Sequence, residues 1–353
     1  MSVSRIAAVA TASPPYVVDQ ADAKRIARTL FADLPERAFD RLAPVFDNVH
    51  IERRHLCAPP EWFAEPHPFA ERNERYQRWA TDLGVAAATA ALDQAGVAPS
   101  DVGSIVFVST TGLATPSLDA RLMARLGLPA RHTHRQAVFG RGCAGGAVGL
   151  GLAADRCQLD PARATLLVVV ELCSLTFRRT DASTANLVSS ALFADGAAAA
   201  VLAPDHRAGD PVVIGQDGVT WPDTEDLMGW RFGDDGMSVT LAKSIPALVR
   251  REFRQSFDDA CACVGVTATD VRHHLVHPGS PVVLDAVAEA LDLAPDALAR
   301  SHDVLRDHGN MSAATVLFIL QRFLADGCAA PGDIAMVSAM GPGFSAEHVA
   351  LRW

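Results

Sequence analysis

The sequence predicts an α/β layered fold, in which helices cover the faces of buried strands. Apolar runs with strand character alternate with helical segments from about residue 80 onward. Hydrophobic residues make up 49% of the 353 residues and charged residues 20%, so the chain can bury a large core. This alternation is typical of layered α/β proteins, and the length suits one large domain or two fused domains.

The elements follow in a regular order along the chain. Residues 20–80 are polar and Arg-rich and are expected to be mostly helical, and 80–95 is Ala-rich with helical periodicity. A nearly continuous apolar run is expected for a strand that is covered on both faces. Runs of strand character occur at 104–109, 165–172, 197–202, 273–277, 334–338 and 349–353.

A weak shift in composition at 204–211 suggests a connection between two halves, 1–205 and 206–353. Each half contains a polar residue that precedes a long helix of small or apolar residues. These residues are Cys143 in the first half and Asn310 in the second. We interpret the shared plan as faint support for an internal duplication.

Charge and hydropathy exclude some classes of function. The net charge is −10, which argues against general nucleic-acid binding. No apolar run is long enough for a membrane span, so we expect no stable membrane insertion. The first residues lack the pattern of a signal peptide, and the seven dispersed cysteines favour a reduced, cytoplasmic enzyme over a disulfide scaffold.

Cys143 is the candidate nucleophile, in the segment FGRGCAGGAVGLGLAAD from Phe139. Four glycines fall in a helix expected from Ala144 onward, and each costs about 1 kcal/mol relative to alanine. That violation of local preference indicates close backbone packing or a functional site. The amino-terminal end of a helix favours a thiolate. Lowering the thiol pKa by about three units needs a further cation, most naturally a histidine. The alternative is that Cys143 is a small apolar filler, as we expect of Cys57, Cys157 and Cys328.

His277 and Asn310 are the candidate partners of Cys143. His277 ends a strand before a turn in which Ser280 is suited to cap a helix that begins with Pro281. Ligands usually bind at this carboxyl end of strands. Asn310 lies at the start of a helix with apolar residues at 313, 314, 317, 320 and 324. Its side chain either caps that helix or directs its amide N–H₂ at a thioester carbonyl.

The three segments, in the order Cys, His, Asn, resemble the thiolase-fold condensing enzymes, specifically type III polyketide synthases. The resemblance extends to TGLATPSLDAR from Thr111, VELCSLTF from Val170, ALFADGAA from Ala191 and GPGFS from Gly341. PDTEDLMGW from Pro222 and the VELCSLTF block look most like bacterial alkylpyrone and alkylresorcinol synthases. The resemblance implies a thiolase-like αβαβα layered fold with two similar halves, and a homodimer.

The resemblance also implies roles for single residues. Cys143 would hold the starter and the growing polyketide as a thioester, and His277 with Asn310 would stabilise the enolate formed when malonyl-CoA loses CO₂. Phe193 matches the aromatic gatekeeper between the CoA tunnel and the reaction cavity. Positions that match the substrate-binding cavity or acyl tunnel are Thr111, Cys173, Leu175, Thr176, Gly229, Val239 and Ser312.

The CoA contacts match the family less well. Family members often bind CoA phosphates with basic residues in this region, where the chain offers Arg53 and Arg54, but Glu52 occupies one commonly basic position. Met340 stands where many relatives have phenylalanine. As a further hypothesis, a run of five arginines forms a basic path that draws anionic CoA thioesters toward the entrance of the active site. The alternative is that acidic residues elsewhere in the fold balance the charges of these arginines. These arginines are at 121, 125, 131, 135 and 141.

The resemblance implies an acyltransferase that loads an acyl-CoA, with a fatty acyl group as the first choice, and extends it with malonyl-CoA. Cyclisation would give an alkylpyrone or alkylresorcinol. CoA thioesters are then substrates, and no cofactor is expected. Cys261 and Cys263 would face different sides of a helix, so we expect no metal site with His273 and His274. The alternatives are a ketoacyl-ACP synthase III-like enzyme and a non-catalytic acyl-binding protein of the same fold.

Overall fold

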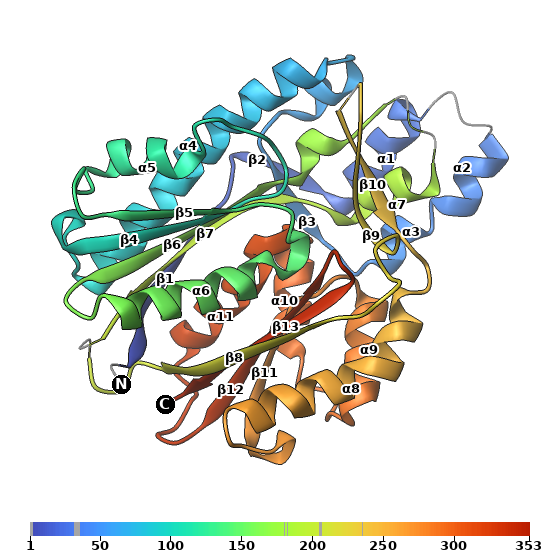
Figure 1. The fold of residues 1–353 in the computed structure, drawn as a ribbon. Coiled ribbons are helices and arrows are strands. Elements are labelled where there is room, and N and C mark those ends of the chain that lie inside the picture. The colour runs from blue at the N-terminus through green and yellow to red at the C-terminus, as the bar shows by residue number, and fades with distance from the viewer. Residues whose placement is uncertain (1–2, 32–35, 180, 182, 205–206, 235) are drawn as a thin grey trace.

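The computed structural model describes residues 3–31, 36–179, 181, 183–204, 207–234 and 236–353. Five layers follow one another in the order helix, sheet, helix, sheet, helix (Figure 1). This is the αβαβα arrangement that the sequence predicts. The expected connection at 204–211 falls partly outside the described residues, at 205–206.

The first sheet is built mainly from the first 205 residues, and its strand order is β5-β4-β6-β7-β1. The two neighbours of β4 run parallel to it, while β6–β7 and β7–β1 are antiparallel. Every residue of β4 and β6 is buried, which explains their continuous apolar sequence. The strands are β1 (Ser4–Ala12), β4 (Val102–Val108), β5 (His134–Val138), β6 (Ala164–Leu172) and β7 (Asp195–Ala203).

The second sheet continues the first one. Its order is β8-β13-β12-β11, and a short antiparallel pairing of β1 with β8 joins the two into nine strands. The first-sheet strand β1 was not predicted, nor was β8, whose partly exposed residues hide it from a search for apolar runs. The strands are β8 (Val212–Thr220), β11 (Val271–Val276), β12 (Ile334–Gly341) and β13 (Ser345–Arg352).

Helices form the other three layers. The outer helices α4 (Phe69–Ala95) and α5 (Leu118–Leu126) cover the first sheet, and α8 (Ile245–Cys263) and α9 (Pro281–Leu291) cover the second. Two helices, α6 (Gly145–Leu159) and α11 (Thr315–Asp326), lie between the sheets and contact strands of both. The central core therefore mixes residues of both halves.

The remaining elements gather toward one end of the layers (Figure 1). Helices α1, α3 and α7 pack on one another, and β10 contacts α7. These elements carry much of the wall of the site described below. They are α1 (Gln20–Leu30), α2 (Glu36–Leu42), α3 (Val45–Asn48), α7 (Thr184–Leu192), α10 (Ala299–His308), β2 (Tyr16–Asp19), β3 (Arg53–Leu56), β9 (Met228–Gly233) and β10 (Gly236–Leu241).

Candidate active site

Cys143 lies in a tight turn between β5 and α6. The turn is a single 3-10 turn, η3 (Gly142–Ala144), and the α-helix itself begins at Gly145, one residue later than the sequence predicts. Gly142 has a φ of +45°, and its N–H donates to Oγ1 of Thr110 at 3.2 Å. Cys143 is 6% exposed. The turn thus holds a nearly buried thiol just before the amino end of a central helix.

The glycines of α6 allow the two central helices to approach each other closely. A Cβ atom on Gly146 would lie 2.2 Å from the carbonyl oxygen of Ala313, and one on Gly145 would lie 3.1 Å from the Cβ of that residue. A Cβ on Gly145 would also lie 2.8 Å from Val108. Close packing therefore explains why residues that weaken a helix occur here.

His277 follows directly after β11. Its N–H donates to the carbonyl of Ser338 at 2.8 Å, which fixes the backbone. Ser280 accepts a hydrogen bond from the N–H of Val283 at 3.3 Å, and Pro281 is the first residue of α9, as predicted. The side chain of His277 is buried, and neither ring nitrogen has a hydrogen-bond partner among the described residues. Both nitrogens remain available to a substrate.

Asn310 precedes the 3-10 turn η6 (Ser312–Ala314), which leads into α11. Its Oδ1 accepts a hydrogen bond from the N–H of Ser312 at 2.8 Å, and its Nδ2 donates to the carbonyl of Gly279 at 3.1 Å. These two contacts set the orientation of the carboxamide. They use only one of the two hydrogens on Nδ2. Hydrogen bonds from Ser312 and Asn310 also act on the thiol of Cys143. The carboxamide of Asn310 thus contacts the turn and lowers the pKa of the Cys143 thiol.

Cys143, His277 and Asn310 line one cavity, which we call the main cavity. Its volume is about 550 Å³, within the usual range for small-molecule sites. Phe193, Met340 and Phe344 contribute apolar walls. Lys243 is the only lysine or arginine among the described residues that line it, and its ammonium group can pair with an anionic substrate group.

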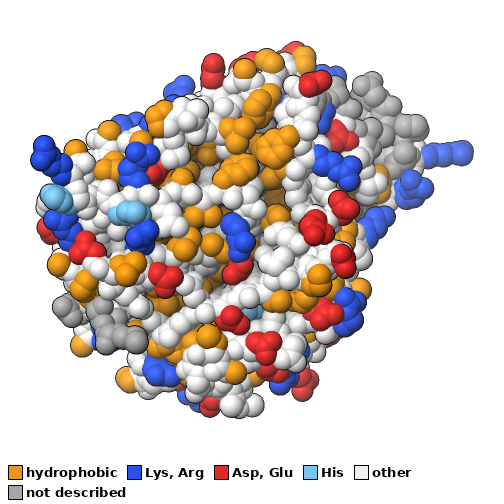
Figure 2. All heavy atoms as spheres, in the orientation of Figure 1, with side chains coloured by type: hydrophobic (Ala, Val, Ile, Leu, Met, Phe, Trp, Pro, Cys, Tyr) orange, Lys and Arg blue, Asp and Glu red, His pale blue; other side chains and the backbone are white. Residues whose placement is uncertain are grey.

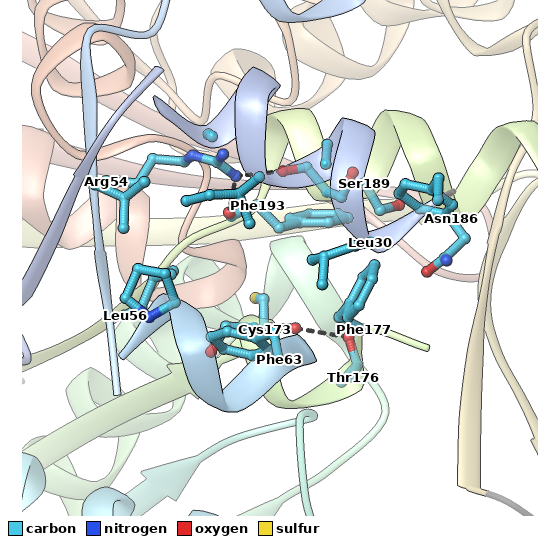
Figure 3. A pocket seen from close by; sticks show the side chains of 18 of the residues that line it. Leu30, Arg54, Leu56, Phe63, Cys173, Thr176, Phe177, Asn186, Ser189 and Phe193 are labelled. Atoms are coloured by element: carbon cyan, nitrogen blue, oxygen red, sulfur yellow. Dashed lines mark hydrogen bonds between the residues drawn. The ribbon is translucent and has the colours of Figure 1, made fainter. Parts of the chain in front are cut away.

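Phe193 lines both the main cavity and a second space, which we call the side pocket (Figure 3). The side pocket has a volume of about 90 Å³ and is mostly apolar. Cys173, Thr176 and Val239, all predicted to line the cavity or tunnel, lie in its wall.

Burial dominates the electrostatics of the pair Cys143 and His277. It raises the pKa of the Cys143 thiol to about 12 and lowers the pKa of the His277 imidazole to about 3. Both groups are therefore favoured in their neutral forms. This differs from the thiolate expected from the sequence, because removing both side chains from water outweighs the effect of the helix end.

Glu171 is a residue of the site that the sequence did not single out, although it lies within the quoted VELCSLTF block. It is fully buried in β6 and accepts a hydrogen bond from the N–H of Thr110 at 3.0 Å. Burial raises its pKa to about 8, so it is largely neutral at pH 7. When ionised, its charge raises the pKa of Cys143. An acidic residue inside a continuous apolar strand was the signal that could have identified it.

Four other predicted residues lie in different places. Ser312 is buried and contacts the Cys143 thiol. Thr111 and Leu175 line a separate space of only about 10 Å³, and Oγ1 of Thr111 accepts a hydrogen bond from the N–H of Leu172 at 2.8 Å. Gly229 pairs with Thr240 between β9 and β10 and lines neither the main cavity nor the side pocket.

Arg54 does not lie where a contact to CoA phosphates needs it. It is 5% exposed, and its Nη1 donates to the carbonyls of Ser190 at 2.6 Å and Phe193 at 2.9 Å. The two arginines alternate across β3, so Arg54 points inward while Arg53 is exposed. Only Arg53 remains a predicted phosphate contact.

Three of the five arginines proposed to attract CoA thioesters form ion pairs with acidic residues. Arg125 pairs with Asp82 at 3.2 Å, Arg135 pairs with Asp119 at 2.7 Å, and Arg141 pairs with Glu347. Figure 2 shows Lys and Arg side chains interspersed with Asp and Glu on this face. Acids from elsewhere in the fold thus balance most of these arginines, which favours the alternative interpretation.

The cysteines and histidines considered for a metal are held by other contacts. Cys261 is buried and Cys263 is exposed, so they face different sides of α8, as predicted. His273 contacts Asp333 at 3.1 Å, and His274 packs against Phe257. In the described part of the chain, no group of three or more His, Cys, Asp or Glu side chains is arranged to hold a metal.

Residues 2–206 match the family model for chalcone and stilbene synthases, N-terminal domain, and residues 216–353 match that for the C-terminal domain. The chain belongs to this family, the type III polyketide synthases. It is therefore an acyltransferase that performs decarboxylative Claisen condensation with malonyl-CoA. Because both models together span most of the chain, we set aside the ketoacyl-ACP synthase alternative.

Several bacterial proteins resemble this type III polyketide synthase. It is 41% identical to a 1,3,6,8-tetrahydroxynaphthalene synthase of Streptomyces peucetius, with 99% of this chain and 93% of the relative covered. It is 35% identical to a putative chalcone synthase of Bacillus subtilis, with 99% and 98% covered. The crystal structure of the tetrahydroxynaphthalene synthase of Streptomyces coelicolor superposes with a TM-score of 0.92 at 29% identity, covering 100% and 99%.

A search of the helices for a membrane span finds none of sufficient length and apolarity among the residues that the structure describes.

Glu171 predicts a distinctive pH dependence for the reactivity of Cys143. Glu171 ionises near pH 8, and its negative charge then disfavours the thiolate. Each unit of thiol pKa changes the thiolate fraction tenfold. We therefore expect Glu171→Gln to be alkylated by iodoacetamide up to about tenfold faster than wild type at pH 9, and at a similar rate at pH 6.5.

The rate must be followed on the Cys143 peptide by mass spectrometry, because Cys263 and Cys328 are exposed thiols that also react. Equal ratios of the two rates at pH 6.5 and pH 9 would show that the Glu171 charge does not reach the sulfur.

Proposed function

We propose that Cys143, His277 and Asn310 carry out the condensation in the main cavity. The observation that supports this is that a thiol, an imidazole with two unpartnered nitrogens and an oriented carboxamide, all three buried, line one cavity. The three come from segments far apart in the chain.

The loading step transfers an acyl group from CoA to Cys143. Neutral His277 accepts the thiol proton as the sulfur attacks the thioester carbonyl, and CoA leaves as the thiol after it regains a proton. The ring is neutral, so a ring nitrogen can accept the proton, although the lowered pKa makes His277 a weaker base than a free imidazole. The resulting acyl-enzyme faces the main cavity.

The extension step forms the carbon–carbon bond. Malonyl-CoA loses CO₂, and the electron pair of the broken bond enters an enolate, whose oxygen receives hydrogen bonds from His277 and Asn310. The enolate carbon attacks the Cys143 thioester, the carbon–sulfur bond breaks, and the chain on CoA is two carbons longer. Loss of CO₂ supplies the carbanion, so this chemistry needs no cofactor.

We further propose a fatty acyl starter and an alkylpyrone or alkylresorcinol product. The apolar side pocket next to Phe193 supports an alkyl chain, and its wall contains Leu30, Phe31 and Phe63. The side pocket, at about 90 Å³, is smaller than the main cavity, at about 550 Å³.

A small starter is the second candidate. The 41% identity to a tetrahydroxynaphthalene synthase favours it, and so does the small side pocket. Tetrahydroxynaphthalene carries no alkyl chain, so no fatty acyl group is needed to make it.

The purified protein should be incubated with malonyl-CoA and a graded series of acyl-CoA starters, and the products identified by mass. We expect products that carry the alkyl starter, none from Cys143→Ala, and a loss of about 10²–10³ in the decarboxylation rate of Asn310→Ala. Tetrahydroxynaphthalene from malonyl-CoA alone, with no effect of added acyl-CoA, would favour the second candidate. If the protein forms product only when a carrier protein is supplied, both the fatty acyl and the small-starter candidates are contradicted.

Cys173→Phe tests the side pocket as the place of the starter chain. The larger ring should fill this space, so we expect kcat/KM for the longest starters to fall about tenfold or more while the shortest change little. Exposed Cys263→Phe is the matched control for an added aromatic ring. Undiminished use of long starters by Cys173→Phe would place the chain elsewhere.

We also propose a homodimer, as the resemblance implies. Strand β5 is an edge strand with largely exposed residues, and Phe139, directly after it, is 49% exposed. Its ring contacts that of Phe232, which is 58% exposed, with 6.5 Å between centroids. An exposed edge beside exposed aromatic rings favours a partner there. Sedimentation velocity should give the mass of two chains, and a single-chain mass at micromolar concentration would contradict this.

A further inference from the structure

Arg54 makes an unusual contact for a buried arginine, because its charge faces backbone carbonyls and, among the residues that the structure describes, no carboxylate is bonded to it. Its Nη1 donates to the carbonyl oxygens of Ser190 and Phe193, at 2.6 and 2.9 Å. These oxygens lie at the carboxyl end of α7, where unpaired carbonyls and the helix dipole attract a cation. In Figure 3 the guanidinium lies beside Phe193, across the side pocket from Cys173.

The segment 190–194, to which Arg54 donates, also forms backbone hydrogen bonds with Asn310. The N–H of Asn310 donates to the carbonyl of Leu192 at 3.0 Å, and the N–H of Ala194 donates to the carbonyl of Asn310 at 2.8 Å. Phe193 and Asn310 thus form an isolated parallel bridge. Any movement of the Phe193 backbone therefore moves Asn310 as well.

The chain makes room for the Arg54 side chain next to Asn310. A Cβ atom on Gly309 would lie 2.8 Å from Cγ of Arg54 and 3.1 Å from Cβ of Ala194. Gly309 also has a φ of +73°, which favours glycine. The stem of Arg54 therefore packs against the residue that precedes Asn310.

A buried carboxylate holds the other side of the same segment. Asp195 accepts hydrogen bonds from the N–H of Cys57 at 2.8 Å, the N–H of Ser174 at 2.8 Å and Oγ of Ser174 at 2.5 Å. It also attracts the charge of Arg54 through space. Phe193 and Ala194 are thus held between a cation on β3 and an anion at the start of β7.

We propose that Arg54 is a positioning residue that sets both the gate formed by Phe193 and the donor group of Asn310. The proposal rests on the proposed function of those two residues. It replaces the role of CoA contact that the sequence suggested for Arg54. If Arg54 holds both, its loss should weaken the coupling between decarboxylation and chain extension, since the enolate and the acyl-enzyme must meet in a fixed geometry.

The test is Arg54→Lys, which keeps the positive charge, but its side chain is shorter by about one bond, so its ammonium group does not reach the place of Nη1 between the two carbonyls. Arg54→Met removes the donors altogether, and Arg5→Lys is the matched control. Arg5 also donates to a backbone carbonyl, that of Asp210 at 2.9 Å, but lies on β1 and lines neither the main cavity nor the side pocket. Thermal unfolding identifies variants that are folded at the assay temperature.

The readout is acetyl-CoA released per polyketide formed from malonyl-CoA and a fixed starter. This ratio does not depend on the fraction of folded protein. We expect it to rise about threefold or more in Arg54→Lys, with kcat for product falling about tenfold and KM changing less than twofold. Arg5→Lys should keep the wild-type ratio.

A wild-type ratio in Arg54→Lys, with only stability or total activity reduced, would overturn the positioning role and leave the proposed function standing. If Arg54→Met does not fold, Arg54→Lys alone decides. Failure of the wild-type enzyme to make any polyketide would instead count against the proposed function.

Discussion

The close approach of α6 to the start of α11 is the constraint on which the site depends. Gly146 lies so near the carbonyl of Ala313 that any side chain there would overlap it. Because these helices lie between two sheets, neither can move outward to make room. The packing brings the turn of Cys143 and the turn of Asn310 to the same end of the central layer, where β11 delivers His277 to the same cavity.

Burial in that layer also determines the chemistry. It favours a neutral thiol, a neutral imidazole and a largely neutral Glu171 at pH 7. In the reaction we propose, charge appears only as the bonds form and break, on the sulfur and on the enolate oxygen. Donors that are already oriented, such as the carboxamide of Asn310, stabilise that charge without having to reorganise. Arg54 is buried as well, and it donates to backbone carbonyls instead of standing exposed for a phosphate contact.

Much of the fold could be predicted from the sequence, because buried strands such as β4 and β6 have continuous apolar runs and Cys143, His277 and Asn310 lie in recognisable segments. In the nine-stranded sheet, strands β1, β5 and β8 were missed, since β5 and β8 have exposed or partly exposed residues and the sequence of β1 consists largely of small residues. The contacts of Arg54 and Arg135 depend on partners distant in the chain. The starter and product depend on the combined shape of side chains from α1, η1 (Pro60–Ala64), α7 and β10, which no local pattern encodes.

The most direct test of the central claim is to locate the acyl group on the enzyme. Rapid quenching after mixing with an acyl-CoA, followed by peptide mass spectrometry, should find the acyl group on the Cys143 peptide, with slower loading in His277→Gln. Loading of Asn310→Ala should stay close to wild type, because Asn310 acts on the enolate. An acyl group on Cys173 or another residue, or loading that does not depend on His277, would contradict the account.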